Sequence, residues 1–179
     1  MTLLTMNWHV WPIWRGVGVA VQSELSRSSY PGLNPQSTDL WRQWLKYYET
    51  SFDSFQYNVR VGQGITPPAY LSDQEKELWK KLTQKRVDVI AHRANQTWII
   101  EVQERADLRT LGQLVGYRHL VPAYTETREV LMLALICARL GHDMALTLKG
   151  NGVIVFYFPV GKPPSFPPTF PPAYVVNPA

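Results

Sequence analysis

Two carboxylates, Asp88 and Glu101, have the residue type and spacing best suited to chemistry. Each lies in a short run rich in β-branched and apolar residues, residues 86–92 and 97–104, and two such runs joined by a short polar segment predict a β-hairpin. If the turn is centred on residues 94–95, where Asn tolerates a positive φ, Asp88 lies directly opposite Glu101. Like charges that face each other destabilise a sheet. The pair therefore predicts a compensating cation, of which a divalent metal is the simplest.

The rest of this hairpin is apolar on both faces. Ile90 and Ile99 alternate in phase with the carboxylates, and the opposite phase holds Val87, Val89, Ala91, Trp98, Ile100 and Val102. A strand that is apolar on both faces predicts a central sheet covered by helices on each side. A buried Asp and Glu are costly unless they are paired or bind a metal. The alternative is an odd-numbered loop and a slipped register, which leaves one carboxylate at a solvated strand end.

These residues belong to a longer pattern. Asp88, then Glu101-Val102-Gln103 on the next predicted strand, then Gln113 and Tyr117 on the following helix, resemble the PD-(D/E)XK nuclease superfamily, including the Gln-x-x-x-Tyr helix motif of its RecB-type members. By element order the resemblance covers residues 38–158, and it implies a restriction-endonuclease-like core that cleaves DNA with Mg²⁺ or Mn²⁺. The usual Lys of the third motif is Gln103 here. Superfamily members with an amide at this position include both active and inactive proteins.

The resemblance implies a role for each motif residue. Asp88, Glu101 and the Val102 carbonyl are expected to hold the metal, since oxygen ligands suit Mg²⁺. The Gln103 amide cannot act as a general base, and is expected to orient the attacking water while the metal lowers the pKa of that water. A further acid from the first helix often completes such a site. Helix and strand directions favour Asp39 for it, although Asp39 also fits a plain N-cap.

Five further residues are candidates for contact with the substrate. Gln113 and Tyr117 are four residues apart, so they share one face of the predicted helix. Arg86, Arg109 and Arg118 carry the charge needed for phosphate contacts. Taken singly, each arginine also fits a solvated surface charge.

The order of the predicted elements indicates an α/β protein with a three-layer α/β/α arrangement and a central mixed sheet. The predicted elements are helices at 40–50, 72–84, 106–120 and 139–146, strands at 55–61, 130–138 and 152–158, and the hairpin strands. Ser72 and Glu75 have the spacing of a capping box. In the third helix, Gly112 and Gly116 predict close packing, and the predicted inward residues are Leu108, Leu111, Leu114 and Val115.

Composition bounds the class of protein. With 179 residues, 45% of them hydrophobic, the chain is expected to build one core and one full domain. The net charge of +4 and the pI near 9.2 permit contact with a polyanion without requiring it. The single cysteine, Cys137, lies in an apolar run and predicts a small buried hydrophobe. No signal peptide or membrane span is expected, so we predict a cytoplasmic protein or one incorporated in a virion.

The two ends of the chain differ from the middle. We divide it into a Trp-rich N-terminal segment at 1–36, a nuclease-like domain at 37–160 and a Pro-rich extended tail at 161–179. Three tandem Pro-Pro-x-aromatic tetrads predict a polyproline II arm that carries Phe166, Phe170 and Tyr174. Such an arm suits binding to a sister subunit or a larger assembly; the last tetrad also resembles a PPxY ligand of WW modules.

Two functions remain open from the sequence. The first is a metal-dependent DNA nuclease, which the carboxylates and the helix motif favour. The second is a nuclease-fold subunit with weak or lost catalysis, acting as a structural or assembly protein in a large complex such as a phage particle. Gln103 and the two unusual ends of the chain favour this alternative, in which those ends serve as binding arms for a homo- or hetero-oligomer.

Overall fold

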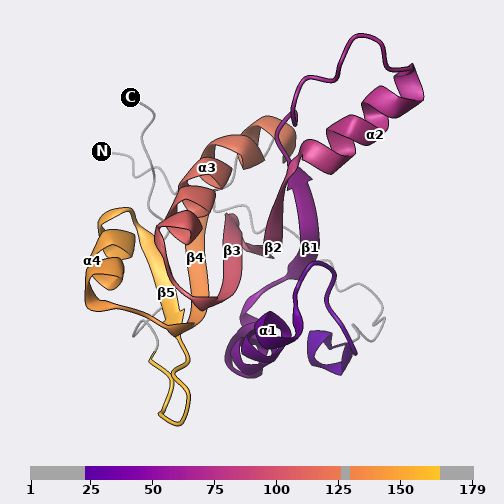
Figure 1. Ribbon diagram of the computed structural model, residues 1–179. Coiled ribbons are helices and arrows are strands. Elements are labelled where there is room, and N and C mark those ends of the chain that lie inside the picture. Colours follow the sequence, from indigo (N-terminus) through magenta and orange to yellow (C-terminus); the bar gives the residue numbers. More distant parts are fainter. Residues whose placement is uncertain (1–22, 126–129, 166–179) are drawn as a thin grey trace, which may run out of the picture.

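The computed structural model describes residues 23–125 and 130–165. Five strands form one mixed sheet in the order β1-β2-β3-β4-β5, in which the first three strands pair antiparallel and the last three pair parallel (Figure 1). The strands are β1 Ser54–Val61, β2 Lys85–Arg93, β3 Gln96–Arg105, β4 Val130–Arg139 and β5 Val153–Tyr157, and the helices are α1 Pro35–Tyr48, α2 Asp73–Thr83, α3 Leu108–Thr125 and α4 His142–Gly150, with short 3₁₀ turns η1 Glu24–Ser26 and η2 Glu49–Ser51. The predicted α/β class and the predicted order of these elements are confirmed.

The sheet lies between two helical layers, as predicted. Figure 1 shows α1 on one side of the sheet and α3 with α4 on the other. Each side has its own apolar core. The α1 side includes Trp41, Trp44, Trp98, Ile100, Val102 and Phe156, and the α3 side includes Ile99, Leu114, Tyr117, Val121, Leu133, Leu135 and Cys137. Cys137 is thus the buried thiol that the sequence predicts, and its burial raises its pKa to about 12.

Helix α1 begins earlier than predicted. Asn34 is its N-cap, since the Asn34 side chain accepts a hydrogen bond from the Ser37 N–H at 2.8 Å. Pro35 follows at the first helical position, where its fixed φ and missing N–H cost nothing. The prediction of a cap at residues 37–39 is therefore wrong. Asp39 instead lies inside the helix with its side chain exposed.

The predicted register of the β2–β3 hairpin is confirmed next to the turn, but the predicted pairs at Asp88 and Arg86 do not form. Arg93 pairs with Gln96, and the ladder continues in step to Val89 and Ile100. The positive φ of the turn falls on Ala94, at 51°, and Asp53 stabilises this turn by accepting a hydrogen bond from the Ala94 N–H at 2.8 Å.

The regular alternation of β2 is interrupted at Asp88. Val87 packs in the core under α3, whereas Val89 packs in the core under α1, so the prediction that both share one face is wrong. On the neighbouring strand, Asn58 has a φ of 53° and is missing from the run of β1–β2 pairs. A left-handed residue does not keep ladder geometry, which allows the two strands to change orientation here.

Helix α3 packs through a different stripe from the predicted one. The residues that it buries, each one helical turn from the next, are Thr110, Leu114, Tyr117 and Val121. Leu108 is 72% exposed, which makes its predicted inward position wrong. Close packing at Gly112 and Gly116 is also wrong, because no neighbouring atom lies within 4 Å of where a side chain would start.

The remaining predictions for local structure have mixed outcomes. The capping box of Ser72 and Glu75 at the start of α2 is confirmed. Helix α4 begins at residue 142 and not at 139, because β4 continues to Arg139. None of the described helices combines the length and apolar character that crossing a bilayer requires. The residues proposed as tail anchors, Phe166, Phe170 and Tyr174, and the tryptophans of the first fifteen residues lie outside the described residues.

Candidate active site

Strands β2 and β3 and helix α3 bring five of the predicted site residues together. Glu101 and Gln103 alternate on the face of β3 that α3 covers, and Asp88 comes from the adjacent part of β2. Gln113 and Tyr117 approach from α3, where they are one turn apart. Hydrogen bonds join members of this group across all three elements, so the tertiary fold assembles the motif that the sequence only placed in order.

The sequence predicts Asp88 directly opposite Glu101, but in the structure Asp88 does not pair with Glu101 in the ladder. The paired residues end at Val89 and Ile100, and the Val102 N–H donates to Asp88 Oδ2 at 3.0 Å. The carboxylate takes the place of a main-chain acceptor at the point where β2 leaves the ladder. The two carboxylates are nevertheless neighbours, because Val102, whose N–H donates to Asp88, directly follows Glu101 in β3.

Glu101 is a nearly fully buried acid, 1% exposed. Its Oε2 accepts a hydrogen bond from Gln103 Nε2 at 3.1 Å, whereas its Oε1 is buried and has no hydrogen-bond partner among the described residues. Burial, and then the charge of Asp88, raise the pKa of Glu101 to about 8. Burial also raises the pKa of Asp88, against the opposing effect of the Val102 N–H. The pair therefore resists carrying two negative charges without a cation.

Gln103 is held on all sides by protein groups. Its Nε2 donates to Glu101 and also to Gln113 Oε1 at 3.2 Å, and its Oε1 accepts from Thr110 Oγ1 at 3.0 Å. An amide has two donor hydrogens and one acceptor oxygen, and each has a partner here. The arrangement aims a donor at Glu101 and leaves Gln103 no spare donor hydrogen with which to orient a water.

Tyr117 connects the network to the start of β2. Its hydroxyl donates to the Arg86 carbonyl at 2.7 Å and accepts from Gln113 Nε2 at 3.4 Å. Burial, and then the negative charge of Glu101, raise the pKa of Tyr117 to about 12. The phenol is therefore neutral at physiological pH and serves as a hydrogen-bonding group.

Sequence reasoning missed Thr110 and Asp107. Thr110 is fully buried, and its Oγ1 lies 3.0 Å from both Gln103 Oε1 and Asp107 Oδ1. Asp107 Oδ1 also accepts from the Thr110 N–H at 2.9 Å, and this hydrogen bond lowers the pKa of Asp107. An Asp three residues before a Thr at the start of a predicted helix is the signal that would have found the pair.

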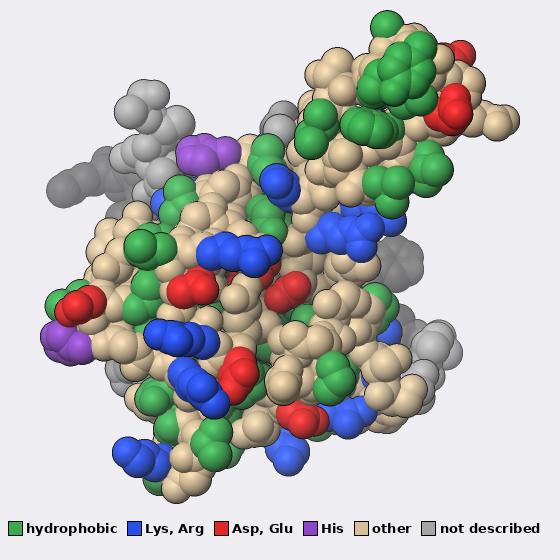
Figure 2. Space-filling view, in the orientation of Figure 1, with side chains coloured by type: hydrophobic (Ala, Val, Ile, Leu, Met, Phe, Trp, Pro, Cys, Tyr) green, Lys and Arg blue, Asp and Glu red, His purple; other side chains and the backbone are tan. Residues whose placement is uncertain are grey.

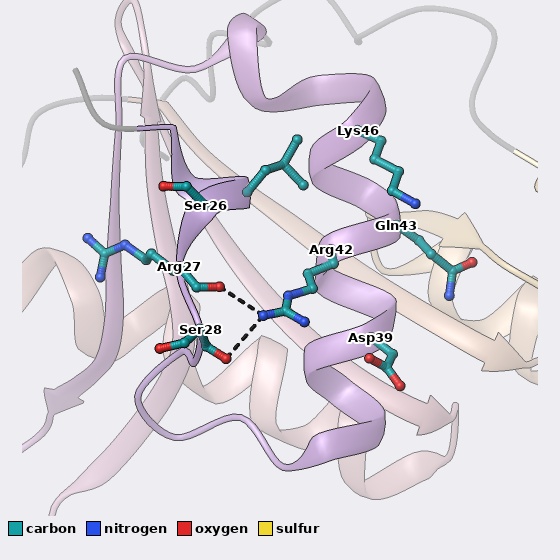
Figure 3. A pocket seen from close by; sticks show the side chains of 8 residues that line it. Ser26, Arg27, Ser28, Asp39, Arg42, Gln43 and Lys46 are labelled. Carbon is teal, nitrogen blue, oxygen red and sulfur yellow. Dashed lines mark hydrogen bonds between the residues drawn. The ribbon is translucent and has the colours of Figure 1, made fainter. Parts of the chain in front are cut away.

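The structure does not bring Asp39 to the carboxylate pair. Asp39 lines a separate hollow with Arg42, Gln43 and Lys46 of α1, and Figure 3 shows Arg42 turned toward residues 26–28. Arg42 donates to the carbonyls of Arg27 and Ser28 at 2.8 and 3.0 Å. Within residues 23–125 and 130–165, no three His, Cys, Asp or Glu side chains gather closely enough to hold a metal.

The Val102 carbonyl, a predicted metal ligand, has a protein partner. Ser37 Oγ, at the start of α1, donates to it at 2.8 Å. This contact brings the beginning of α1 beside β3, as the helix and strand directions predict. One lone pair of the carbonyl remains for another ligand.

The three candidate arginines have different surroundings. Arg109 is exposed beside the network, since it directly precedes Thr110 in α3. Arg86 places its main chain at Tyr117 and its side chain in solvent. Arg118 donates to the Asn151 carbonyl at 3.0 Å and so points toward the end of α4. Figure 2 shows Lys and Arg side chains around acidic ones on the face that includes α3.

Fold and site together define a three-layer α/β protein with a carboxylate pair, a buried Glu101 and a half-buried Asp88, at the open end of a central hairpin. No family model matches the chain, and neither a curated protein nor a solved structure is significantly similar to it. Inferences about function therefore depend on the geometry of these residues.

Proposed function

We propose that the chain is a metal-dependent phosphodiesterase of the PD-(D/E)XK type, with a restriction-endonuclease-like core, that cleaves DNA. The support is the position of the motif residues on consecutive elements. Asp88 lies on β2, Glu101 and Gln103 lie on β3, and Gln113 and Tyr117 lie on α3. Hydrogen bonds join the last four, and Asp88 accepts from the Val102 N–H beside Glu101.

The observation that carries the proposal is the carboxyl pair itself, in which Glu101 Oε1 has no N–H or hydroxyl donor among the described residues and has Asp88 beside it. Near neutral pH the metal-free pair avoids two buried charges by keeping a proton on Glu101, and a divalent cation can replace that proton and neutralise both acids. The oxygen donors suit Mg²⁺ or Mn²⁺, which bind through one or two carboxylates and keep several waters. Asp88, Glu101 and the free lone pair of Val102 would hold the ion. A metal there supplies an activated water and polarises the phosphoryl oxygen.

The other residues have supporting roles in this proposal. Gln103 holds Glu101 Oε2 and so turns Oε1 toward the ion, which replaces the water-orienting role expected from the sequence. Gln113 and Tyr117 hold Gln103 and the end of β2 in place. Arg109 and the Arg86 side chain are exposed beside the site and would contact phosphates of the DNA.

Cleavage and metal binding should be tested together. We expect wild-type protein with Mg²⁺ or Mn²⁺ to cut supercoiled or linear DNA, and Glu101→Ala to lose cutting and calorimetric metal binding while remaining folded. Glu104→Ala is the matched control, since Glu104 lies on the same strand but is exposed and paired with Arg139 at 3.0 Å. If the wild type binds neither ion, or if Glu101→Ala binds as well as the wild type, the proposal is wrong.

A specific observation favours a second candidate, a nuclease-fold subunit with weak or lost catalysis that acts in the assembly of a large complex. Gln103 brings no positive charge to the site, and among the described residues no third carboxylate joins the pair. Such a site stabilises the charge of a phosphoryl-transfer transition state less well than one with a Lys. Metal binding without cleavage of single- or double-stranded DNA would favour this function. Either function suits a protein of the cytoplasm or of a virion.

A further inference from the structure

Helix α2 projects away from the body of the protein. Figure 1 shows it at the end of a long loop, beyond the edge of both helical layers. None of its residues is buried. Its contacts with the described chain are local: Thr83 Oγ1 accepts from the Ile65 N–H at 2.9 Å, and the adjoining Gln84 donates to the Gly62 carbonyl at 2.8 Å.

Helix α2 exposes two leucines to solvent. Leu78 and Leu82 are one turn apart on the same face and are 56% and 66% exposed. Tyr70 and Ile65, in the loop before the helix, are exposed as well. Figure 2 shows hydrophobic side chains over the projecting arm at the upper right. Two large exposed leucines on a helix held out from the domain indicate a face that another protein covers.

The charges beside the leucines indicate which protein that is. Glu77 and Lys81 are both exposed and lie one turn apart on one flank of the Leu78–Leu82 face. When two copies of α2 pack antiparallel through this face, Leu78 of each copy lies near Leu82 of the other. Glu77 of each copy then faces Lys81 of the other. An isologous contact requires such self-complementarity, in which one residue meets a second and the second meets the first.

We propose that α2 is a dimerisation arm that pairs antiparallel with α2 of a second copy of this chain. Nucleic acid does not suit this face, since a polyanion gains nothing from Leu78 and Leu82. The inference is independent of the proposed nuclease activity, because no residue of the carboxylate network takes part.

Sedimentation equilibrium of the full chain tests the pairing, from nanomolar to high micromolar concentration. We expect the wild type to dimerise reversibly, and Leu78→Lys to weaken the dimer about tenfold or more without loss of fold, because the residue is exposed. Leu146→Lys is the matched control: Leu146 is 59% exposed on α4, and its substitution should leave the dimer unchanged. A wild type that stays monomeric, or a dimer indifferent to Leu78→Lys, overturns the proposal.

A charge exchange tests the antiparallel geometry. Glu77→Lys alone and Lys81→Glu alone each set like charges against each other across the interface, so both should dimerise weakly. A mixture of the two variants should recover association. In the mixed dimer the Glu77→Lys chain carries lysine at both positions and the Lys81→Glu chain carries glutamate at both, so opposite charges face each other on both sides. Mixing cannot repair a change within one helix. Failure of the mixture to associate more tightly than either variant alone therefore overturns the pairing.

Discussion

Gln103 Nε2 donates a hydrogen bond to Glu101 Oε2 at 3.1 Å, while Glu101 Oε1 stays buried without a partner among the described residues. A neutral amide thus stands where the resemblance leads one to expect an ammonium group. It orients the acid without compensating its charge. The stability of the protein and any metal chemistry should both depend on how Glu101 is neutralised.

The first prediction concerns pH. In the folded protein the pKa of Glu101 is raised to about 8, whereas its ordinary pKa is 4.5, so between pH 4.5 and 8 the folded state binds more protons than the unfolded state. The free energy of unfolding without metal should therefore fall as pH rises through this window. Asp88, whose pKa is also raised, contributes with the same sign.

Denaturant unfolding in a chelator, below and above that window, measures this effect. The fall should be on the order of a few kcal/mol, should be much smaller in Glu101→Gln, and should be offset by Mg²⁺, which binds the folded state. A wild type whose unfolding free energy rises or stays level over the window would contradict the assignment.

The second prediction concerns Gln103→Lys. The lysine ammonium has three donors, and the acceptors around Gln103 are Glu101 Oε2, Gln113 Oε1 and Thr110 Oγ1. The new charge should lower the pKa of Glu101 and flatten the pH dependence of unfolding. Cleavage of DNA, if present, should be preserved or rise, because the lysine charge stabilises the negative charge that develops in phosphoryl transfer.

Gln103→Met is the control for this change, because it has a similar length and no donor. It should abolish metal-dependent activity and leave Glu101 with two unpartnered oxygens. If Gln103→Lys and Gln103→Met have the same metal-dependent activity, the hydrogen bond to Glu101 does not contribute to function.

The third prediction concerns Thr110→Val, which keeps the shape of the buried side chain and removes its hydroxyl. Gln103 Oε1 then loses its donor, and the free energy of unfolding should fall by about 1–3 kcal/mol. Metal affinity should fall too, because the amide is free to turn its oxygen toward Glu101. Thr147→Val is the comparison, since that hydroxyl donates only to the Asp143 carbonyl one turn back in α4. Calorimetry with Mn²⁺ and thermal unfolding of both variants decide the point, and equal effects would argue against a role for Thr110 in the site.

Local patterns were sufficient for much of the fold. The register of the β2–β3 hairpin follows from turn length and from apolar alternation, both of which are short-range properties. The capping box at Ser72 follows from two side chains that reach each other's backbone within one turn. The order of helices and strands, and the two apolar faces of the central strands, likewise need no knowledge of distant contacts.

Long-range contacts decided the rest. The start of α1 depends on Asn34 and Pro35, and its rotation on the sheet leaves Asp39 in a hollow away from the carboxylates. The inward stripe of α3 is set by how the helix crosses β3, which buries Thr110 and exposes Leu108.

The candidate site divides in the same way. Sequence alone determined that Asp88, Glu101, Gln103, Gln113 and Tyr117 lie on two hairpin strands and the next helix, because each interval matches the period of its element. Only the tertiary structure decided that Asp88 accepts from the Val102 N–H, that Gln103 is held by Thr110 and Gln113, and that Glu101 Oε1 is left alone. The physical reason is that a side-chain hydrogen bond depends on distances of tenths of an ångström between elements far apart in the chain, and no sequence interval specifies those distances.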